Sequence, residues 1–183
     1  MTTLAFDTAT SFGAVCGTSR GTVARTARAG DLLDAVNQLV PDPAEIEQIV
    51  VGRGPGSFTS IRIGLAMARS LALALEVPVA GASTLDAYDA GVPVIDARRG
   101  EIFTTGPRVT APEELDVEGK TLVGDGALRY RAVFEGRGAT IPPDDDPAHV
   151  PDPLLLIARA GTPGEAELVE PLYVRDPDAR PQA

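Results

Sequence analysis

The stretch GRGPGSFTSIRIGLAMARS, from Gly52 to Ser70, decides how the chain is organised, because it joins an apolar strand to a long helix. Its first part holds three glycines and a proline, and its second part carries small and apolar residues at helical spacing. Glycine-rich turns that open helices commonly hold phosphate, because unpaired backbone N–H groups point outward there. This turn either binds an anion or only sets the direction of the helix.

The turn fits neither of the common phosphate-binding patterns. A Walker A loop needs a lysine followed by serine or threonine after its second glycine, and a dinucleotide fingerprint has a different glycine spacing. Pro55 removes a backbone donor from the turn, while Ser57 and Thr59 can cap the following helix. A structural turn is therefore favoured over an anion site, with Gly54 and Gly56 kept as candidate nucleotide contacts.

A second candidate is FDTAT at Phe6–Thr10, where a strand ends in an aspartate and a hydroxyl-rich turn follows. The actin and sugar-kinase superfamily holds phosphate and metal with this arrangement, usually with glycine at the position of Ala9. Asp7, Thr8 and Thr10 are therefore candidate nucleotide contacts. A polar hairpin turn without a ligand is an equal alternative.

The facing turn that such a nucleotide site needs is degenerate. In IDARRGE, Ile95–Glu101, the residues Arg98 and Arg99 replace the small residues of a phosphate turn, and Gly124–Gly126 is a thin adenosine-binding candidate. The stretches LAFDTATSFGAVC and PVIDARRGEIFTT still share a strand, an aspartate, a turn and a second strand, which suggests a duplicated, two-lobe architecture. The sequence predicts no catalytic residue.

The composition bounds the class of protein. The 183 residues are 44% apolar and 23% charged, enough for one domain or two small lobes of a soluble protein. The net charge of −10 and the absence of tryptophan argue against direct binding of nucleic acid, which depends on cations and aromatic stacking. The longest apolar stretch, Ile61–Val77, contains Arg62, Arg69 and Glu76, so neither a membrane span nor a signal peptide is expected.

Metal and nucleophile chemistry have few candidate residues. The one cysteine, Cys16, lies in an apolar run and suits a reducing cytoplasm. The one histidine, His149, lies in a loop rich in proline and aspartate, with no partner at metal-ligand spacing. The run Asp144–Asp146 is more typical of a solvated loop than of a cation site. No metal site and no required cofactor are predicted.

The helix that starts near Ile61 is the most informative element. It carries small residues at four-residue spacing, with bulky apolar residues beside them. The small residues are Gly64, Ala68 and Ala72, and the bulky ones are Leu65, Met67 and Leu71. A helix that is apolar on most faces either is buried within its own lobe or packs against a partner. A preceding helix, Asp31–Val40, can lie alongside it and extend the patch.

The element signals divide the chain into two lobes. Residues 1–91 predict an α/β lobe of strands, two main helices and a further strand. Residues 92–175 predict a smaller lobe that opens with two strands around a turn at Ala97–Gly100, and a helix at 154–160 can pack back on the first lobe. Residues 176–183 predict a disordered tail.

Four stretches, in the same order, resemble one family: LAFDTAT at the N-terminus, GRGPGSFTSIRIGLA, VIDARRGEIF, and EPLYVR near the end. They span most of the chain, and the glycine-rich stretch is highly specific. The chain resembles the TsaB family, also called YeaZ, of bacterial tRNA threonylcarbamoyladenosine synthesis. The resemblance implies an α/β, two-lobe, actin-like fold of the ASKH superfamily, related to ribonuclease H, with a reduced second lobe.

The resemblance also implies a cytoplasmic subunit without catalysis of its own. Such a subunit pairs with the catalytic protein TsaD and, with the ATPase TsaE, supports transfer of a threonylcarbamoyl group to an adenine beside the tRNA anticodon. The tRNA is reached only through the partner, and ATP or ADP can lie at the joint with TsaD. TsaB proteins also form homodimers through helices of the first lobe. The interface so implied comprises Leu32, Leu33, Val36, Ile61, Gly64, Leu65, Met67, Ala68, Leu71 and Ala72.

Two departures from the family bear on any nucleotide contact. Ser60 stands where the family usually has glycine, and the second lobe is short. An alternative from another class is an enzyme, either a small ATPase of the same superfamily or a glycoprotease-like protein. An ATP hydrolysis assay on the purified chain separates the two classes.

Overall fold

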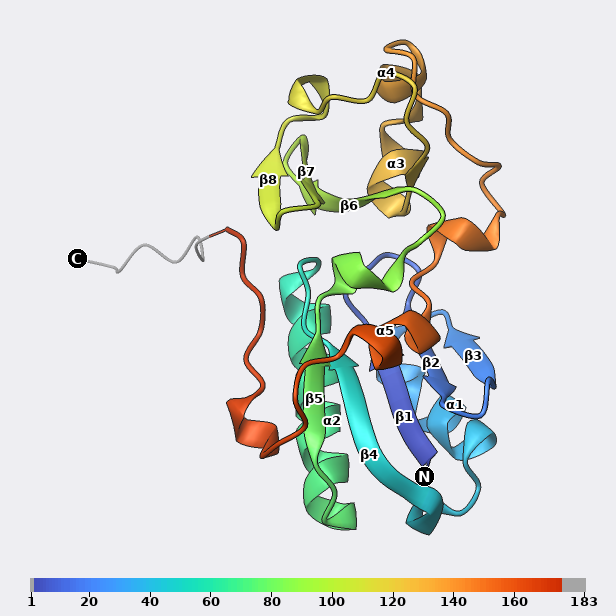
Figure 1. The fold of residues 1–183 in the computed structure, drawn as a ribbon, viewed down its shortest axis with the longest axis vertical. Helices are drawn as coiled ribbons and strands as arrows, with labels where there is room; N and C mark the ends of the chain where they lie inside the picture. Colours follow the sequence, from blue (N-terminus) through green and yellow to red (C-terminus); the bar gives the residue numbers. More distant parts are fainter. Residues whose placement is uncertain (1, 176–183) are drawn as a thin grey trace, which may run out of the picture.

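The computed structural model describes residues 2–175, which form two α/β lobes stacked end to end (Figure 1). Residues 176–183, where the sequence predicts a disordered tail, lie outside the described residues. The first lobe contains β1 (Thr2–Asp7), β2 (Ala14–Thr18), β3 (Val23–Thr26), α1 (Leu32–Leu39), β4 (Ile46–Gly52), α2 (Phe58–Leu75) and β5 (Val79–Ala82), with 3-10 turns at Ala29–Asp31, Pro43–Glu45 and Thr84–Ala87. This is the order of strands and helices that the sequence predicts.

The sheet of the first lobe has the strand order β3-β2-β1-β4-β5. The hairpin β1–β2 is antiparallel, and β4 and β5 continue the sheet in parallel from β1. All six residues of β1 are buried, as expected for a central strand covered on both faces. The carboxyl ends of β1 and β4 therefore meet at one edge, where the two turns singled out in the sequence begin.

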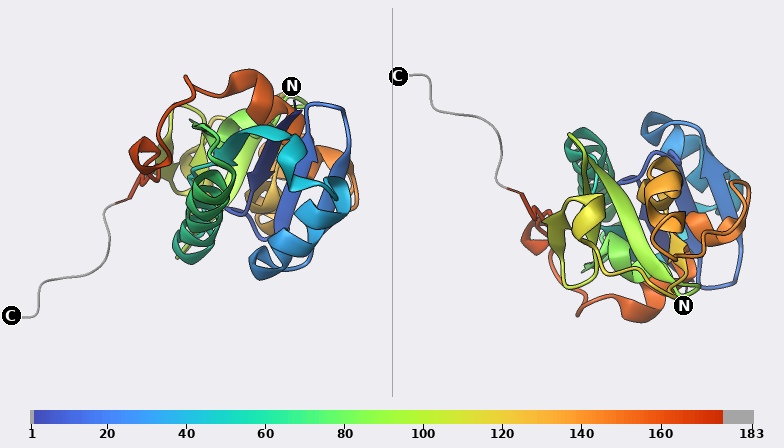
Figure 2. Two further views of the ribbon diagram at one scale, coloured as in Figure 1. Left: turned by 90° about the horizontal axis from the view of Figure 1, so that it is seen from below. Right: turned by 90° about the horizontal axis from the view of Figure 1, so that it is seen from above.

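Helices cover both faces of this sheet (Figure 2). Helices α1 and α2 lie side by side on one face, and their buried residues share a core with Leu4, Phe6 and Ile49. A short helix from the end of the chain, α5 (Pro153–Arg159), packs on the other face, where Leu156 joins a second core with Val50. The sheet and its two helical layers make the first lobe a closed α/β unit.

The second lobe repeats the first in reduced form. It contains β6 (Val92–Arg98), β7 (Glu101–Thr104), β8 (Arg108–Thr110), β9 (Leu122–Val123), α3 (Asp125–Arg129) and α4 (Arg131–Glu135), with 3-10 turns at Pro112–Glu114 and Pro147–His149. Its strand order, β8-β7-β6-β9, matches β3-β2-β1-β4, with an antiparallel hairpin and a parallel fourth strand in each lobe. The duplicated two-lobe architecture is that of the actin-like fold.

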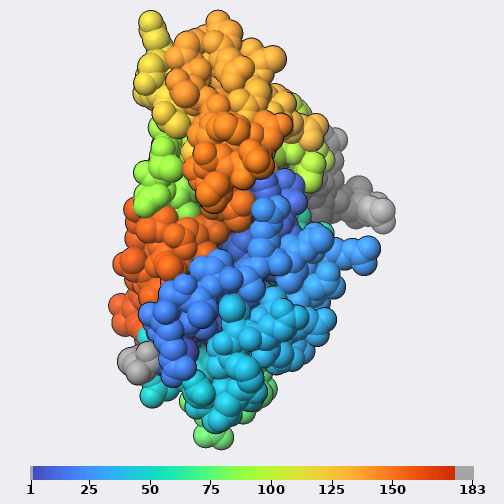
Figure 3. Space-filling view, turned by 90° about the vertical axis from the view of Figure 1, so that its right-hand side faces the viewer, coloured from blue at the N-terminus to red at the C-terminus, as the bar shows by residue number. Residues whose placement is uncertain are grey.

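The end of the chain returns to the first lobe, so the second lobe is shorter than the predicted range 92–175. Helix α5 packs on β1, and Val79 of β5 pairs with Gly164 in an antiparallel bridge. The 3-10 turn Ala166–Leu168 then packs beside α2. Figure 3 shows the orange and red surface of this segment against the blue strands of the first lobe.

Two local features differ from the sequence analysis. Helix α2 begins at Phe58, one turn before the predicted start, because Ser57 caps it. The segment Gly124–Gly126, the thin adenosine-binding candidate, opens α3, and α4 follows it.

Within residues 2–175, α2 is the helix with the length and composition of a membrane span. Core helices of soluble proteins often share these properties. Helix α2 also carries Arg62 and Arg69 and packs one face on its own sheet. The expectation of no membrane span is kept.

Candidate functional site

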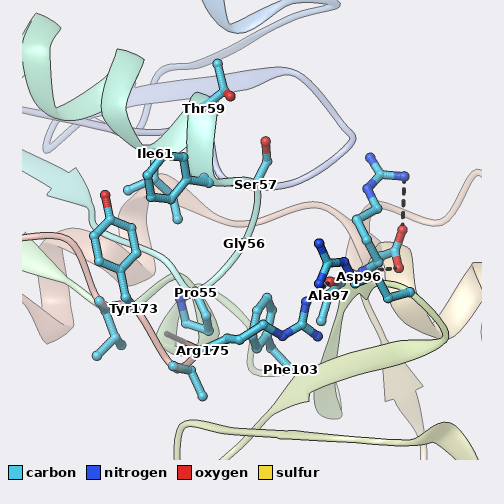
Figure 4. Close-up of a pocket in the computed structure, with 15 residues that line it drawn as sticks. Pro55, Gly56, Ser57, Thr59, Ile61, Asp96, Ala97, Phe103, Tyr173 and Arg175 are labelled. Carbon is cyan, nitrogen blue, oxygen red and sulfur yellow. Dashed lines mark hydrogen bonds and ion pairs between the residues drawn. The ribbon is translucent and has the colours of Figure 1, made fainter. Parts of the chain in front are cut away.

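Two cavities lie at the junction of the lobes. The larger has a volume of about 470 Å³ and is lined by the start of α2, the β6–β7 turn and residues 172–175 (Figure 4). The smaller, about 220 Å³, is lined by the turn after β1, by Ser57 and Ser60, and by Asp96 and Asp125 of the second lobe. The turns predicted to face each other across a cleft are therefore brought together.

Asp7, the first candidate nucleotide contact, faces inward from the end of β1. Its side chain is in the core at 1% exposure, and neither cavity is lined by it. Its Oδ1 accepts a hydrogen bond from the backbone N–H of Ala9 (2.7 Å), and its Oδ2 accepts one from the hydroxyl of Thr84 (2.6 Å). Both carboxylate oxygens are thus engaged by the protein itself.

Burial raises the pKa of the Asp7 carboxyl above its usual value, although the hydrogen bonds from Thr84 and Ala9 act in the opposite direction. The negative charge of Asp125 raises this pKa further. A raised pKa and an inward carboxylate do not fit a ligand for a metal-bound nucleotide, which needs an ionised oxygen free toward the cleft. Nucleotide contact at Asp7 therefore has no support from this geometry and stays a prediction.

Gly52, at the start of the glycine-rich stretch, makes room for Asp7. A Cβ at Gly52 would lie 1.8 Å from Asp7 Oδ2, closer than any real contact. Gly64 serves Thr8 in the same way, since a Cβ there would lie 2.5 Å from Thr8 Oγ1. The two glycines therefore allow the turn after β1 to pack tightly on β4 and α2.

The glycine-rich turn is anchored by backbone contacts. Ser57 N–H donates to the carbonyl of Ala9 (2.8 Å), and a Cβ at Gly56 would lie 2.3 Å from the same carbonyl oxygen. Gly54 N–H donates to the hydroxyl of Thr84 (3.2 Å), and Gly54 is buried away from both cavities. The turn joins the two predicted loops and aims α2, which is the structural alternative of the sequence analysis.

The remaining candidate nucleotide contacts do reach the cavities. Gly56 lines the larger cavity, and Thr8 and Thr10 line the smaller one. The Thr8 hydroxyl donates to the carbonyl of Ser60 (2.6 Å). Ser60, which stands where the family usually has glycine, therefore supports the turn through its backbone carbonyl. Nucleotide contact at these three positions stays a prediction.

The second turn places arginines where a phosphate turn has small residues. Arg98 and Arg99 both adopt left-handed backbone conformations, with φ of 62° and 55°, which are strained for residues other than glycine. Asp96 accepts ion pairs from Arg98 (3.1 Å) and Arg129 (3.3 Å). The aspartate that corresponds to Asp7 in the repeat is thus neutralised by cations.

Asp125 is a functional residue that sequence reasoning missed, because it lies far along the chain from both turns. Its Oδ2 accepts from Ser11 N–H of the first lobe (2.8 Å), and its Oδ1 accepts from Asp96 N–H of the second (3.0 Å). One buried carboxylate therefore ties the two turns together. The glycines on either side of it were the available signal, since Gly126 packs against the backbone of Ile95.

Tyr88 lies near these carboxylates in the core at the lobe junction. Burial, followed by the charges of Asp125 and Asp7, raises its pKa well above the usual value. Among the described residues, its hydroxyl is buried without a hydrogen-bond partner. The junction therefore combines two buried acids and a neutral phenol, and residues 2–175 contain no cluster of three or more His, Cys, Asp or Glu suited to a metal.

The small-residue stripe of α2 faces the sheet of its own lobe. Seven of the ten predicted interface residues belong to the first-lobe core: Leu32, Val36, Ile61, Gly64, Leu65, Ala68 and Ala72. Met67 and Leu71 are partly buried against that core, and Leu33 is 41% exposed. The prediction that the stripe forms an open face is therefore wrong, because Gly64 and its small neighbours let α2 approach the sheet closely.

The exposed face of α2 lies on the opposite side of the helix. Ile63 is 36% exposed and Leu73 is 81% exposed, and Ala66 and Ser70 lie between them at helical spacing. Arg62 and Arg69 flank this line of residues. Ile63, Ala66 and Leu73 therefore leave an apolar line bordered by cations on the helical side of the first lobe.

A comparison with models of known protein families identifies a match for this chain. The family model described as "TsaD: tRNA N6-adenosine threonylcarbamoyltransferase" matches residues 31–128, more than half of the 183 residues. This region runs from the start of α1 into α3. It includes the glycine-rich turn and the β6–β7 turn, but not the turn after β1.

Relatives among characterised and uncharacterised proteins agree with this match. An uncharacterised protein of Mycobacterium tuberculosis is 35% identical over 154 residues, covering 76% of this chain and 69% of the relative. The tRNA threonylcarbamoyladenosine biosynthesis protein TsaB of Bacillus subtilis is 37% identical over 84 residues, covering 39% of this chain and 37% of the relative. The TsaB protein of Escherichia coli is 42% identical over 69 residues, covering 32% of this chain and 30% of the relative.

Solved structures share the fold over nearly the full length. A crystal structure from Pseudomonas aeruginosa, described as a protein with similarity to peptidase YEAZ, superimposes with a TM-score of 0.74 at 25% sequence identity. The match covers 95% of this chain and 99% of that one. The chain therefore belongs to the TsaB (YeaZ) family of actin-like proteins.

Proposed function

We propose that this chain is a non-catalytic subunit of the bacterial complex that makes threonylcarbamoyladenosine in tRNA. Its TsaB relatives carry that biosynthesis in their names. In this proposal the chain acts by binding and supporting the catalytic protein TsaD, with the ATPase TsaE completing the assembly. The work takes place in the cytoplasm, and the tRNA contacts the complex mainly through TsaD.

The inward carboxylate of Asp7 supports the absence of independent catalysis. The first turn directs its acid into hydrogen bonds with Thr84 and Ala9, and the second turn pairs its acid with arginines. Neither acid is therefore free to hold a metal ion or to activate water in the cleft. A nucleotide, where one binds, would need groups from a partner.

The exposed apolar face of α2 is the main observation in favour of binding to TsaD. Leu73 at 81% exposure and Ile63 are large apolar residues that the isolated lobe leaves in water. Interfaces commonly combine an apolar centre with a polar rim, and Arg62 and Arg69 supply such a rim here. We assign TsaD to this face, and in its absence a second copy of the chain, which gives a homodimer.

Acidity supports an indirect role toward tRNA. The net charge of −10 opposes association with a polyanion, because non-specific affinity for nucleic acid comes from cationic side chains. A gel shift with tRNA and the chain alone, near physiological salt, should show no complex at low micromolar protein. A complex formed without TsaD would contradict the indirect role.

The experiment that tests the proposal is calorimetric titration of this chain with TsaD from the same organism. The wild-type chain should bind, and Leu73→Glu should weaken binding by at least about 100-fold, because a charge would be buried against an apolar partner. Val23→Glu is the matched control, since Val23 is an exposed valine of β3. Its neighbour Ala24 packs toward α1, so Val23 points to the opposite face of the sheet.

The outcomes separate the parts of the proposal. Absence of binding by the folded wild-type chain would overturn the role as a TsaD subunit. Wild-type affinity in both Leu73→Glu and Ile63→Glu would overturn the assigned face alone. Steady ATP hydrolysis by the isolated chain, well above a buffer blank, would favour the alternative of a small ATPase.

A further inference from the structure

The last described residues, 161–175, run as an extended strap along the first lobe (Figure 1). Gly161 N–H donates to the carbonyl of Gly81 (3.1 Å), and Gly164 exchanges two backbone hydrogen bonds of 2.9 Å with Val79. The strap therefore begins by pairing with β5, the edge strand of the sheet, which leaves this edge covered.

The strap then follows α2 toward the lobe junction. The guanidinium of Arg69 donates to the carbonyl of Val169 (3.0 Å), and Leu172 N–H donates to the carbonyl of Arg53 (2.7 Å). The ring of Tyr173 stacks on Phe58 at 5.1 Å, and its hydroxyl accepts from Arg62 (3.0 Å). These contacts fix the strap on the first turns of α2.

The end of the strap reaches the second lobe at Arg175, beside Val174, which packs against the core that both lobes share. The guanidinium of Arg175 donates to the carbonyl of Ala97 (3.2 Å) and forms an ion pair with Glu101. These two partners stand on either side of the β6–β7 turn. A planar guanidinium can donate hydrogen bonds to a carbonyl and a carboxylate at the same time, which a flexible ammonium does less well.

The contacts of Arg175 lie away from the two segments where the chain crosses between the lobes. The chain passes between the lobes near residue 91 and near residue 150, and Figure 1 shows both crossings on the side away from the strap. Residues 172–175 form one wall of the cavity of about 470 Å³, with the start of α2 and the β6–β7 turn as the others. A hinge at the crossings would therefore open the cavity at the strap.

We propose that residues 161–175 act as a strap that latches the second lobe onto the first, with Arg175 as the latch that sets the opening of the cavity between them. The strap is fixed on the first lobe by backbone hydrogen bonds. Within the described residues its polar contacts to the second lobe come from Arg175, and Val174 packs against the core that both lobes share. Release of the latch frees the β6–β7 turn, whose arginines are held in strained conformations, while both lobes keep their folds. This inference concerns the isolated chain and is independent of the identity of its partner.

Hydrogen exchange measured by mass spectrometry on the full chain tests the latch. In Arg175→Ala, peptides that cover residues 95–103 should exchange about ten-fold faster than in the wild-type chain, and peptides from β1 and β4 should not change. Arg175→Lys should restore only part of the protection. The matched control is Arg137→Ala, because Arg137 also bonds two carbonyls of the second lobe, those of Pro112 and Leu115, but lies outside the strap.

Two results would overturn the latch. One is exchange of residues 95–103 in Arg175→Ala within two-fold of the wild-type rate. The other is an equal increase in Arg137→Ala, which would show general loosening of the second lobe. If Tyr173→Ala, which removes the stack on Phe58, also speeds exchange at 95–103, the strap as a whole holds the lobes, as the proposal states.

Discussion

Asp7 ends β1 with both carboxylate oxygens hydrogen-bonded to its own lobe. Gly52 leaves the space that the carboxylate occupies, and Thr84 donates its hydroxyl to it. The inward carboxylate therefore joins the end of β1 to β4 and to the turn after β5.

Substitution of Gly52 tests this packing. A methyl group in Gly52→Ala would clash with Asp7 Oδ2, so the variant should lose about 3 kcal/mol of the free energy of unfolding, from overpacking and a displaced hydrogen bond. Denaturant unfolding measures it. Gly30→Ala is the control, because nothing lies within 4 Å of a Cβ at Gly30, and its stability should stay near that of the wild type.

The pH dependence of stability reports on the Asp7 carboxyl. Burial places its pKa in the folded state above the ordinary value of 3.8, so the folded protein binds this proton more tightly than the unfolded chain does. The resulting stability is present below the unfolded pKa and is lost as the pH rises through the folded pKa. Asp7→Asn, which stays neutral, should therefore gain stability relative to the wild type as the pH rises above the ordinary pKa of an aspartate.

Chemical denaturation of both proteins across this pH range supplies the measurement. A stability difference that stays constant with pH would show that the pKa of the Asp7 carboxyl is the same in the folded and unfolded states. A difference that moves in the opposite direction would contradict the assigned burial.

At the scale of the element, α2 performs two tasks with two faces. Its small residues pack on the sheet, and its exposed line from Ile63 to Leu73 faces water. The sequence predicted the helix and its stripe correctly but not the side on which the stripe lies. Spacing alone gives the stripe, whereas the partner of each face depends on where β4 and the glycine-rich turn place the helix axis.

A glutamate should unfold the protein when it is placed on the buried face of α2, and leave it folded when it is placed on the exposed face. Ala68→Glu puts an unpaired carboxylate against the sheet and should cost about 4 kcal/mol or more, enough to unfold a marginally stable domain. Ala74→Glu adds the same side chain on an exposed position of the same helix and should leave the protein folded. Circular dichroism with size-exclusion chromatography distinguishes them, and a folded Ala68→Glu chain would contradict the assignment of the stripe to the core.

At the scale of the whole molecule, two lobes of matching topology meet at a junction where Asp125 bonds the turns of both lobes. The sequence contained the signals for the duplication, because each lobe starts with a strand, an aspartate, a turn and a returning strand. For this contact it offered only the glycines beside Asp125, which do not identify the distant partners Ser11 and Asp96. The return of the strap to the first lobe was missed for the same reason.

Buried His149 shows the same limit of local patterns. The sequence placed it in a polar loop, yet the structure buries it, with Nδ1 accepting from Gly124 N–H (3.2 Å) and Nε2 3.1 Å from the carbonyl of Pro142. Its partners are supplied by backbone groups, which no residue pattern identifies. Long elements and turns could be predicted, and contacts between distant loops could not.

The joint between lobes is tested by Asp125→Ala. Two backbone N–H groups, those of Ser11 and Asp96, would lose a charged acceptor, so the free energy of unfolding should fall by about 2 kcal/mol. Asp125→Asn keeps an acceptor oxygen for one of them and should fall by about half as much. Equal stability of all three proteins in denaturant unfolding would contradict the role of Asp125 as a tie between lobes.

Reconstitution of tRNA modification tests whether this chain acts as a subunit of TsaD. Purified chain, TsaD and TsaE from the same organism are incubated with tRNA, ATP and a source of threonylcarbamoyl-adenylate, and threonylcarbamoyladenosine is measured by mass spectrometry of the digested tRNA. We expect modified adenosine only when this chain and TsaD are both present, and none with the chain alone. Modification by the chain without TsaD, or full modification by TsaD and TsaE without the chain, would contradict this role.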